Sequence, residues 1–202
     1  MDPLIDEKII LTLTRVCSEF FKENLYLSAD KEAFGPSRNE GLCYETCVKI
    51  GFEGEINGTL YFGMDGYTKL KLLPRIAERY QIDPTLKGMA TSVILEFANQ
   101  MTSTIVDELI EGGYQTSLLP PEDVSHRLIP IDPGVYRQYI LIFFLRDRRE
   151  RKYLGRIYIV LTMRKYRESG DAQSPEEEGA ISERSDSEIE EDPEFQIDEN
   201  YD

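Results

Sequence analysis

Residues 84–111 read PTLKGMATSVILEFANQMTSTIVDELIE, and this stretch decides the fold. At about 100° per residue, its apolar side chains gather on one broad arc of a helix. The arc comprises Leu86, Met89, Ala90, Val93, Ile94, Phe97, Ala98, Met101, Ile105 and Leu109. The spacing predicts a long helix with this arc against the core. Asp83 and Pro84 predict its start, and Gly112-Gly113 predicts its end.

The opposite face of this helix carries short side chains where long charged ones are usual. It has Glu96 and Asn99 at its centre, Ser92 and Ser103 on the same line, and Leu95 and Val106 at its flanks. Such a face, free of bulk, is typical of a docking surface. Because Glu96 and Asn99 are three residues apart, they can enter a shallow pocket together. The alternative is an exposed Glu and Asn that only keep the helix hydrated.

The chain before this helix predicts a helix and a hairpin. Residues 3–26 have helical apolar spacing and predict an amphipathic core helix. Residues 28–41 are expected to form a loop. The apolar runs at 43–52 and 56–64 are separated by a turn-prone Glu-Gly-Glu, which predicts a β-hairpin.

The remaining segments complete an α+β pattern. Residues 66–80 have helical spacing, although Pro74 is expected to kink or divide that helix. Three extended runs follow the long helix, at about 126–131, 137–146 and 155–164, and the last two are rich in β-branched and aromatic residues typical of central strands. The predicted fold is α+β, a mainly antiparallel sheet with long helices packed on it.

Acidic residues are concentrated at the end of the chain. Residues 170–202 contain 14 acidic residues and one basic residue, whereas the remaining 169 residues contain 24 acidic and 22 basic ones. We therefore predict a folded domain over 1–169 and an acidic disordered tail over 170–202. The nearly neutral body gives no reason to expect a nucleic-acid partner.

One basic stretch, residues 146–152, lies between the two predicted central strands. It is interpreted as a solvated hairpin tip, with a contact to phosphate or an acidic partner as the alternative. The acidic tail could compete for this tip or slow the approach of an acidic partner.

Several classes of chemistry lack material in this sequence. Cys17, Cys43 and Cys47 are predicted to be reduced thiols rather than a disulfide or metal site, and the single histidine, His126, is predicted to be structural at a strand edge. Nucleotide-cradle and esterase motifs are absent from the 202 residues. Without a signal peptide or an apolar run of about 18 residues, we expect a cytoplasmic protein without membrane insertion.

Two segments of this sequence together resemble a known family. Residues 94–101, ILEFANQM, followed by residues 117–121, SLLPP, resemble the CheX branch of the CheC/CheX/FliY chemotaxis phosphatases, with their E-x-x-N helix and downstream serine and prolines. The motif lies within a long helix, after a hairpin and before a β-rich half. That order is similar to the family's layout over about residues 3–166.

The resemblance implies a phosphatase of two-component signalling whose substrate is a phosphorylated CheY-type response regulator. By this resemblance, Asn99 holds a water in line with the phosphorus, and Glu96 pairs with a lysine of the regulator. The regulator supplies Mg²⁺, so the chain is expected to need no cofactor or metal of its own. Phosphoryl transfer requires mostly positioning and charge neutralisation, for which two side chains are enough.

Four further assignments come from the helical projection rather than from the family. Ser92 and Ser103 are predicted to give a partner clearance, and Leu95 and Val106 are predicted to make apolar rim contacts. Leu95 occupies a position where the family is expected to have a small residue.

The resemblance leaves alternatives open. The first predicted helix lacks the second E-x-x-N of the CheC branch, so one active helix per chain is expected. The resemblance to the CheX branch also implies a homodimer, which is expected to form through sheet edges. The alternatives to an enzyme are a non-catalytic module that binds a regulator or flagellar-switch protein, and a scaffold whose helix face serves self-association.

Overall fold

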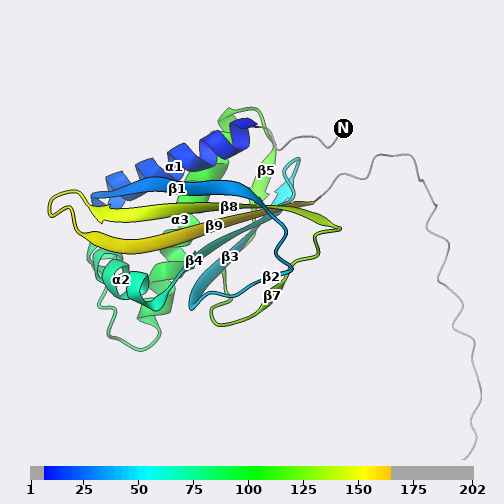
Figure 1. Cartoon of the computed structure of the whole chain (residues 1–202). Helices are drawn as coiled ribbons and strands as arrows, with labels where there is room; N and C mark the ends of the chain where they lie inside the picture. The colour runs from blue at the N-terminus through cyan, green and yellow to red at the C-terminus, as the bar shows by residue number, and fades with distance from the viewer. Residues whose placement is uncertain (1–6, 165–202) are drawn as a thin grey trace, which may run out of the picture. The chain divides into compact units, whose positions relative to one another are not determined.

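The computed structural model describes residues 7–164, which form three helices and nine strands (Figure 1). The helices are α1 (Glu7–Leu25), α2 (Gly66–Tyr80) and α3 (Met89–Glu111). The strands are β1 (Leu27–Ser37), β2 (Gly41–Leu42), β3 (Thr46–Gly54), β4 (Gly58–Met64), β5 (Thr116–Leu118), β6 (Glu122–Asp123), β7 (Ile129–Pro130), β8 (Tyr136–Asp147) and β9 (Tyr153–Arg164). The predicted tail over 170–202 and the domain boundary at 169 lie outside the described residues and stay predictions.

Seven strands form one antiparallel sheet in the order β1-β8-β9-β4-β3-β5, with β6 also paired to β3. The predicted hairpin is β3 and β4, and the two predicted central strands are β8 and β9, inside the sheet. In the view of Figure 1, α3 passes behind the strands and α1 lies alongside β1 at the edge of the sheet. The α+β prediction with a mainly antiparallel sheet is therefore confirmed.

Both faces of the sheet carry apolar residues. Consecutive side chains of a strand point to opposite faces, and consecutive residues of the central strands are apolar. The main core contains Val48, Phe62 and Ile159 together with the helices. Their neighbours Cys47, Tyr61 and Val160 point to the other face, where they form a smaller cluster with residues next to the β2–β7 pair. Both faces of the central strands are thus covered, which explains their nearly continuous apolar sequence.

The long helix begins later than predicted. Its first residue is Met89, after Gly88 in the left-handed region at φ 81°, and Asp83 instead accepts hydrogen bonds from the backbone and hydroxyl of Thr85 in a separate turn. Leu86 is consequently 58% exposed rather than part of the apolar arc. The prediction failed because an Asp-Pro pair can open a turn as readily as a helix.

The end of α3 is as predicted. Gly113 adopts φ 97°, and the amide of Tyr114 donates to the carbonyl of Leu109 at 3.0 Å. A glycine with positive φ and this backward hydrogen bond make a Schellman-type stop.

Two other expectations were wrong, and a third was wrong in part. Residues 28–41 are mostly strand: β1 has a polar sequence but is an edge strand held by its backbone ladder to β8. Pro74 does not divide α2, which continues from Gly66 to Tyr80 with Leu72 and Ile76 fully buried on either side of the proline; the kink, the other alternative, stays a prediction. His126 lies exposed in a turn at φ 59°, not at a strand edge.

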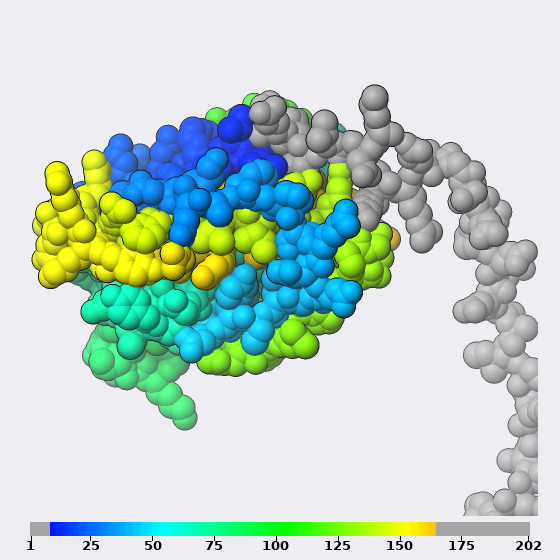
Figure 2. Space-filling model, in the orientation of Figure 1, coloured from blue at the N-terminus to red at the C-terminus, as the bar shows by residue number. Residues whose placement is uncertain are grey.

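The basic stretch forms the turn between β8 and β9, which projects from one end of the molecule (Figure 2). Asp147 organises it by accepting hydrogen bonds from the amides of Glu150 and Arg149 and from the guanidinium of Arg75, the last at 2.5 Å. The Glu150 amide is the largest cause of the lowered pKa of Asp147, followed by the Arg149 amide and Arg75, against the effect of burial. The buried carboxylate of Asp147 therefore connects this turn to α2 through Arg75.

Candidate active site on helix α3

The helix face predicted to dock a partner, which we call the ridge (Ser92, Glu96, Asn99 and Ser103), lies on the outward side of α3. Glu96 and Ser92 are exposed, and Asn99 and Ser103 are half-buried. Glu96 is thus at the centre of the open face, while Asn99 is at its margin. The structure brings these four residues onto one ridge, as the helical spacing predicted.

The two apolar flanks of the ridge differ. Leu95 is half-buried and packs partly against the core, so part of its side chain remains accessible. Val106 is only 5% exposed and belongs to the core, so its predicted place on the rim is wrong. Because α3 contacts β3, β5 and β6 as well as the other two helices, its buried arc is wider than the projection indicated.

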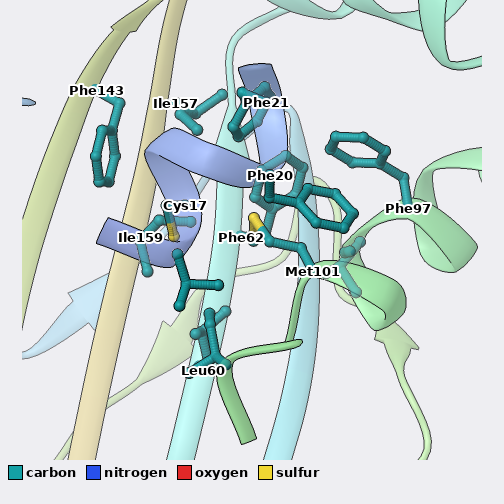
Figure 3. Packing of buried hydrophobic residues seen from close by; sticks show 14 of the residues in the cluster. Cys17, Phe20, Phe21, Leu60, Phe62, Phe97, Met101, Phe143, Ile157 and Ile159 are labelled. Carbon is teal, nitrogen blue, oxygen red and sulfur yellow. The ribbon is translucent and has the colours of Figure 1, made fainter. Parts of the chain in front are cut away.

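Phe97 fixes the rotation of α3 about its axis. Its ring is fully buried and lies edge-on to Phe20 and Phe21 at centroid distances of 5.2 and 5.4 Å, with Phe62 at 6.2 Å (Figure 3). Since consecutive residues of a helix project about 100° apart, inserting Phe97 into this aromatic cluster turns Glu96 outward.

The Glu96 carboxylate is held by a short hydrogen-bonded chain. The side-chain amide of Gln100 donates to Glu96 Oε1 at 2.7 Å, and the hydroxyl of Tyr80 donates to Gln100 Oε1 at 2.8 Å. Burial, and then the negative charge of Glu96, raise the pKa of Tyr80 to about 12, with Arg79 opposing. The phenol is therefore protonated at neutral pH and available as the donor.

The Asn99 carboxamide, in contrast, makes no hydrogen bond to any other residue within 7–164. The hydroxyl of Ser92, one turn before Glu96, bonds back to the carbonyl of Gly88 at 3.2 Å. Asn99 therefore presents both an amide donor and a carbonyl acceptor beside a carboxylate whose position is set. This arrangement can hold a water, which can donate to the carboxylate or the amide carbonyl and accept from the amide N–H.

No protein-family model matches the chain, and no curated protein matches it in sequence. Its structure is similar to that of the chemotaxis protein CheX from Desulfovibrio desulfuricans, with a TM-score of 0.62 and 9% identity over 77% of this chain and 99% of that one. A CheX–CheY–BeF₃–Mg²⁺ complex from Borrelia burgdorferi contains a chain with TM-score 0.57 and 18% identity over 78% of this chain and 98% of its own. FliY from Thermotoga maritima gives 0.50, with 12% identity over 80% and 92%.

This chain has the CheC/CheX/FliY-family fold. The fold implied by the E-x-x-N resemblance is therefore confirmed, while the roles of Glu96 and Asn99 stay predictions because a likeness at such low identity shows the fold alone.

Beside the ridge, the CheX-like fold of this chain has a groove between α1 and α3. Its volume is about 590 Å³, and Glu19, Glu23, Gln100 and Ser103 are among the residues that line it. Ser103 thus lies on the wall shared by the ridge and the groove, and its role in giving a partner clearance stays a prediction.

The cysteines of this CheX-like chain are all free, as predicted. Burial raises the pKa of Cys17 to about 12, and burial followed by nearby Asp123 and Cys43 raises that of Cys47 to about 12. Such thiols are protonated and unreactive at neutral pH. Within residues 7–164, histidine, cysteine and carboxylate side chains form no group of three or more able to hold a metal ion, and no helix there has the length and apolar content to cross a bilayer.

Sequence reasoning missed two residues of the site. Gln100 could have been found, because a Gln four residues after a Glu on a helix is placed to donate to it. Tyr80 belongs to another helix, and no local pattern indicates that α2 ends beside Gln100.

Proposed function

We propose that this protein is a phosphatase that hydrolyses the aspartyl phosphate of a CheY-type response regulator. The observation that carries the proposal is the pair on α3, an exposed, oriented Glu96 and an Asn99 carboxamide without a partner within the described residues. The fold supports it, since a CheX of this fold from Borrelia burgdorferi forms a complex with CheY, BeF₃ and Mg²⁺.

In the proposed reaction the two side chains have separate tasks. The carbonyl of Asn99 accepts a hydrogen bond from a water and orients it for in-line attack on the phosphorus. The Glu96 carboxylate pairs with a lysine ammonium of the regulator and thereby fixes the regulator against the ridge. Neither task requires a strong base, because phosphoryl transfer depends mainly on positioning and charge stabilisation.

Mg²⁺ is proposed to arrive with the regulator. When bound there it would neutralise phosphoryl charge. The residues of this chain would orient the water and hold the partner, and the described residues contain no carboxylate cluster suited to a resident ion.

The remaining ridge residues are proposed to shape the contact. Ser92 and Ser103 are short enough to let a partner approach α3 closely, and the accessible part of Leu95 offers an apolar contact at the rim. Val106 has no place in this contact because it is buried.

A homodimer and a cytoplasmic location complete the proposal. Among the described strands, β1 and β5 are outermost in the order of the sheet and offer edges for pairing. A molar mass in solution of about twice the 23.3 kDa chain would support the dimer, and a mass equal to one chain would refute it.

The second candidate function is a module of the same fold that binds a regulator or flagellar-switch protein without turning it over. The observation that favours it is Leu95, a bulky, partly exposed residue directly before Glu96, where it could hold a partner away from Asn99.

The test is the lifetime of phosphorylated CheY-type regulators, taken as a panel, with the wild-type protein, with Asn99→Ala and with Glu96→Ala. We expect Asn99→Ala to lower the hydrolysis rate about 100-fold with binding retained. Glu96→Ala should weaken binding about 10-fold or more, as expected for a lost charged contact. Glu40→Gln, which changes an exposed acid outside α3, in the connection between β1 and β2, is the control and should be unchanged. Binding without any change in lifetime for the wild type would favour the second candidate instead.

A further inference from the structure

We propose that Gln100 and Tyr80 are positioning residues that hold the Glu96 carboxylate ready for the partner's ammonium and keep it away from Asn99. This inference rests on the proposed function of the ridge and adds two residues to it. Neither belongs to the E-x-x-N pattern itself.

The chain of hydrogen bonds leaves little freedom in its assignment. Tyr80 can donate to Gln100 only at the carbonyl oxygen, so the amide nitrogen of Gln100 must point to the other side, where Glu96 Oε1 accepts from it at 2.7 Å. Tyr80 comes from the last turn of α2 and Gln100 from the middle of α3. The link between two helices therefore fixes the orientation of an amide that would otherwise be free to turn over.

The protonation state of Tyr80 supports this direction of donation. Burial and the nearby Glu96 charge raise its pKa to about 12, so the hydroxyl keeps its proton at any pH at which the protein would work. We call the hydrogen-bonded chain from Tyr80 through Gln100 to Glu96 the clasp. A surface glutamate without such a chain samples several rotamers, and ordering it on binding costs conformational entropy. The clasp removes part of that cost before the partner arrives.

The clasp also protects Asn99. Residues three apart on a helix can reach one another, so an unrestrained Glu96 could accept a hydrogen bond from the Asn99 amide. That bond would occupy the group proposed to orient the water. At about 100° per residue, Gln100 and Asn99 project to different flanks of Glu96. Gln100 donates to Oε1, and Oε2 accepts no hydrogen bond from residues 7–164, which leaves it for the partner's ammonium.

The experiment is a double-mutant cycle on regulator dephosphorylation. Gln100→Ala and Tyr80→Phe are each made in the wild type and in Glu96→Ala, and kcat and KM are measured separately. With Glu96 present, we expect Gln100→Ala to lower kcat/KM about 3- to 10-fold and Tyr80→Phe about 2-fold. In the Glu96→Ala background both changes should have no further effect, because their influence passes through Glu96.

Two controls make the cycle decisive. Tyr67→Phe removes a hydroxyl from an exposed tyrosine at the other end of α2 and should leave kcat/KM unchanged. Midpoints of urea unfolding show whether each variant is folded under assay conditions. An equal loss from Gln100→Ala with and without Glu96, or no loss with Glu96 present, would overturn the inference.

Failure of the proposed function is recognised separately. If the wild type does not shorten the phosphorylated lifetime of any regulator, the phosphatase proposal fails. The same double-mutant cycle is then measured on the binding affinity for a CheY-type regulator loaded with beryllofluoride and Mg²⁺. A loss of affinity from Gln100→Ala that disappears in Glu96→Ala would still support the clasp. An affinity unaffected by Gln100→Ala would refute it.

Discussion

Substitution of Phe97 should separate the stability of the core from the geometry of the site. The ring is fully buried and contacts three other aromatic rings, at centroid distances of 5.2, 5.4 and 6.2 Å. Truncating a buried Phe to Ala costs about 3–5 kcal/mol, and each well-arranged ring pair adds about 0.5–1.5 kcal/mol beyond area burial. We therefore expect Phe97→Ala to lose about 4–5 kcal/mol, a large part of the stability of an ordinary domain.

Because Phe97→Ala could unfold the protein, the positional effect is best measured with Phe97→Leu. We expect this change to cost about 1–2 kcal/mol in urea unfolding, since the volume is largely kept and the shape is not. Phe143→Leu is the matched control, because Phe143 is equally buried but lies on β8. Regulator dephosphorylation is then measured at a temperature at which all variants are folded.

If Phe97 sets the rotation of α3, Phe97→Leu should lower the dephosphorylation rate by about 10-fold while Phe143→Leu leaves it nearly unchanged, since small misplacements of positioning groups are costly. Equal rates for the two variants would show that Phe97 contributes stability alone. A cost below about 1 kcal/mol for Phe97→Ala would refute the packing argument itself.

Three further predictions concern the rest of the fold. Arg75→Ala should lower the free energy of unfolding by about 1 kcal/mol at pH 7. The turn amides and Arg75 depress the pKa of Asp147, so their stabilisation is present above the unfolded pKa of this carboxyl and is lost as pH falls through its folded pKa. The difference in unfolding free energy between wild type and Arg75→Ala, measured in urea, should therefore be smaller at pH 2.5 than at pH 7. Gly155→Ala should cost about 2–4 kcal/mol in thermal unfolding, because φ is 134° and an added methyl would meet a threonine side chain of α2, and an unchanged melting temperature would contradict this. In the native protein a thiol reagent should modify one equivalent rapidly, at exposed Cys43, and three only after unfolding; rapid modification of all three would show that the two buried thiols are accessible.

The sequence predicted those features that depend on local patterns. The paired glycines after α3 mark its end because a left-handed residue is needed there, and the continuous apolar runs of β8 and β9 mark strands covered on both faces. Edge strand β1 was missed because its backbone ladder, rather than its composition, makes it a strand.

The site was predicted in part for the same reason. Helical spacing placed Glu96 and Asn99 on one ridge, but it could not show how far the strands cover the flank that includes Val106. Tyr80 was out of reach because its contact with Gln100 depends on how two helices pack.

The aromatic anchor directly after Glu96 has a consequence for how such a protein could diversify. Because Phe97 packs into this aromatic cluster, α3 cannot slide or rotate to accommodate a different partner without disrupting the core, so the positions of Glu96 and Asn99 are fixed. Specificity for one partner over another must then come from the surrounding segments, namely the connection at 81–88 before α3 and the walls of the groove beside α1. Exchanging those segments between proteins of this fold should transfer partner specificity while the positions of Glu96 and Asn99 stay unchanged.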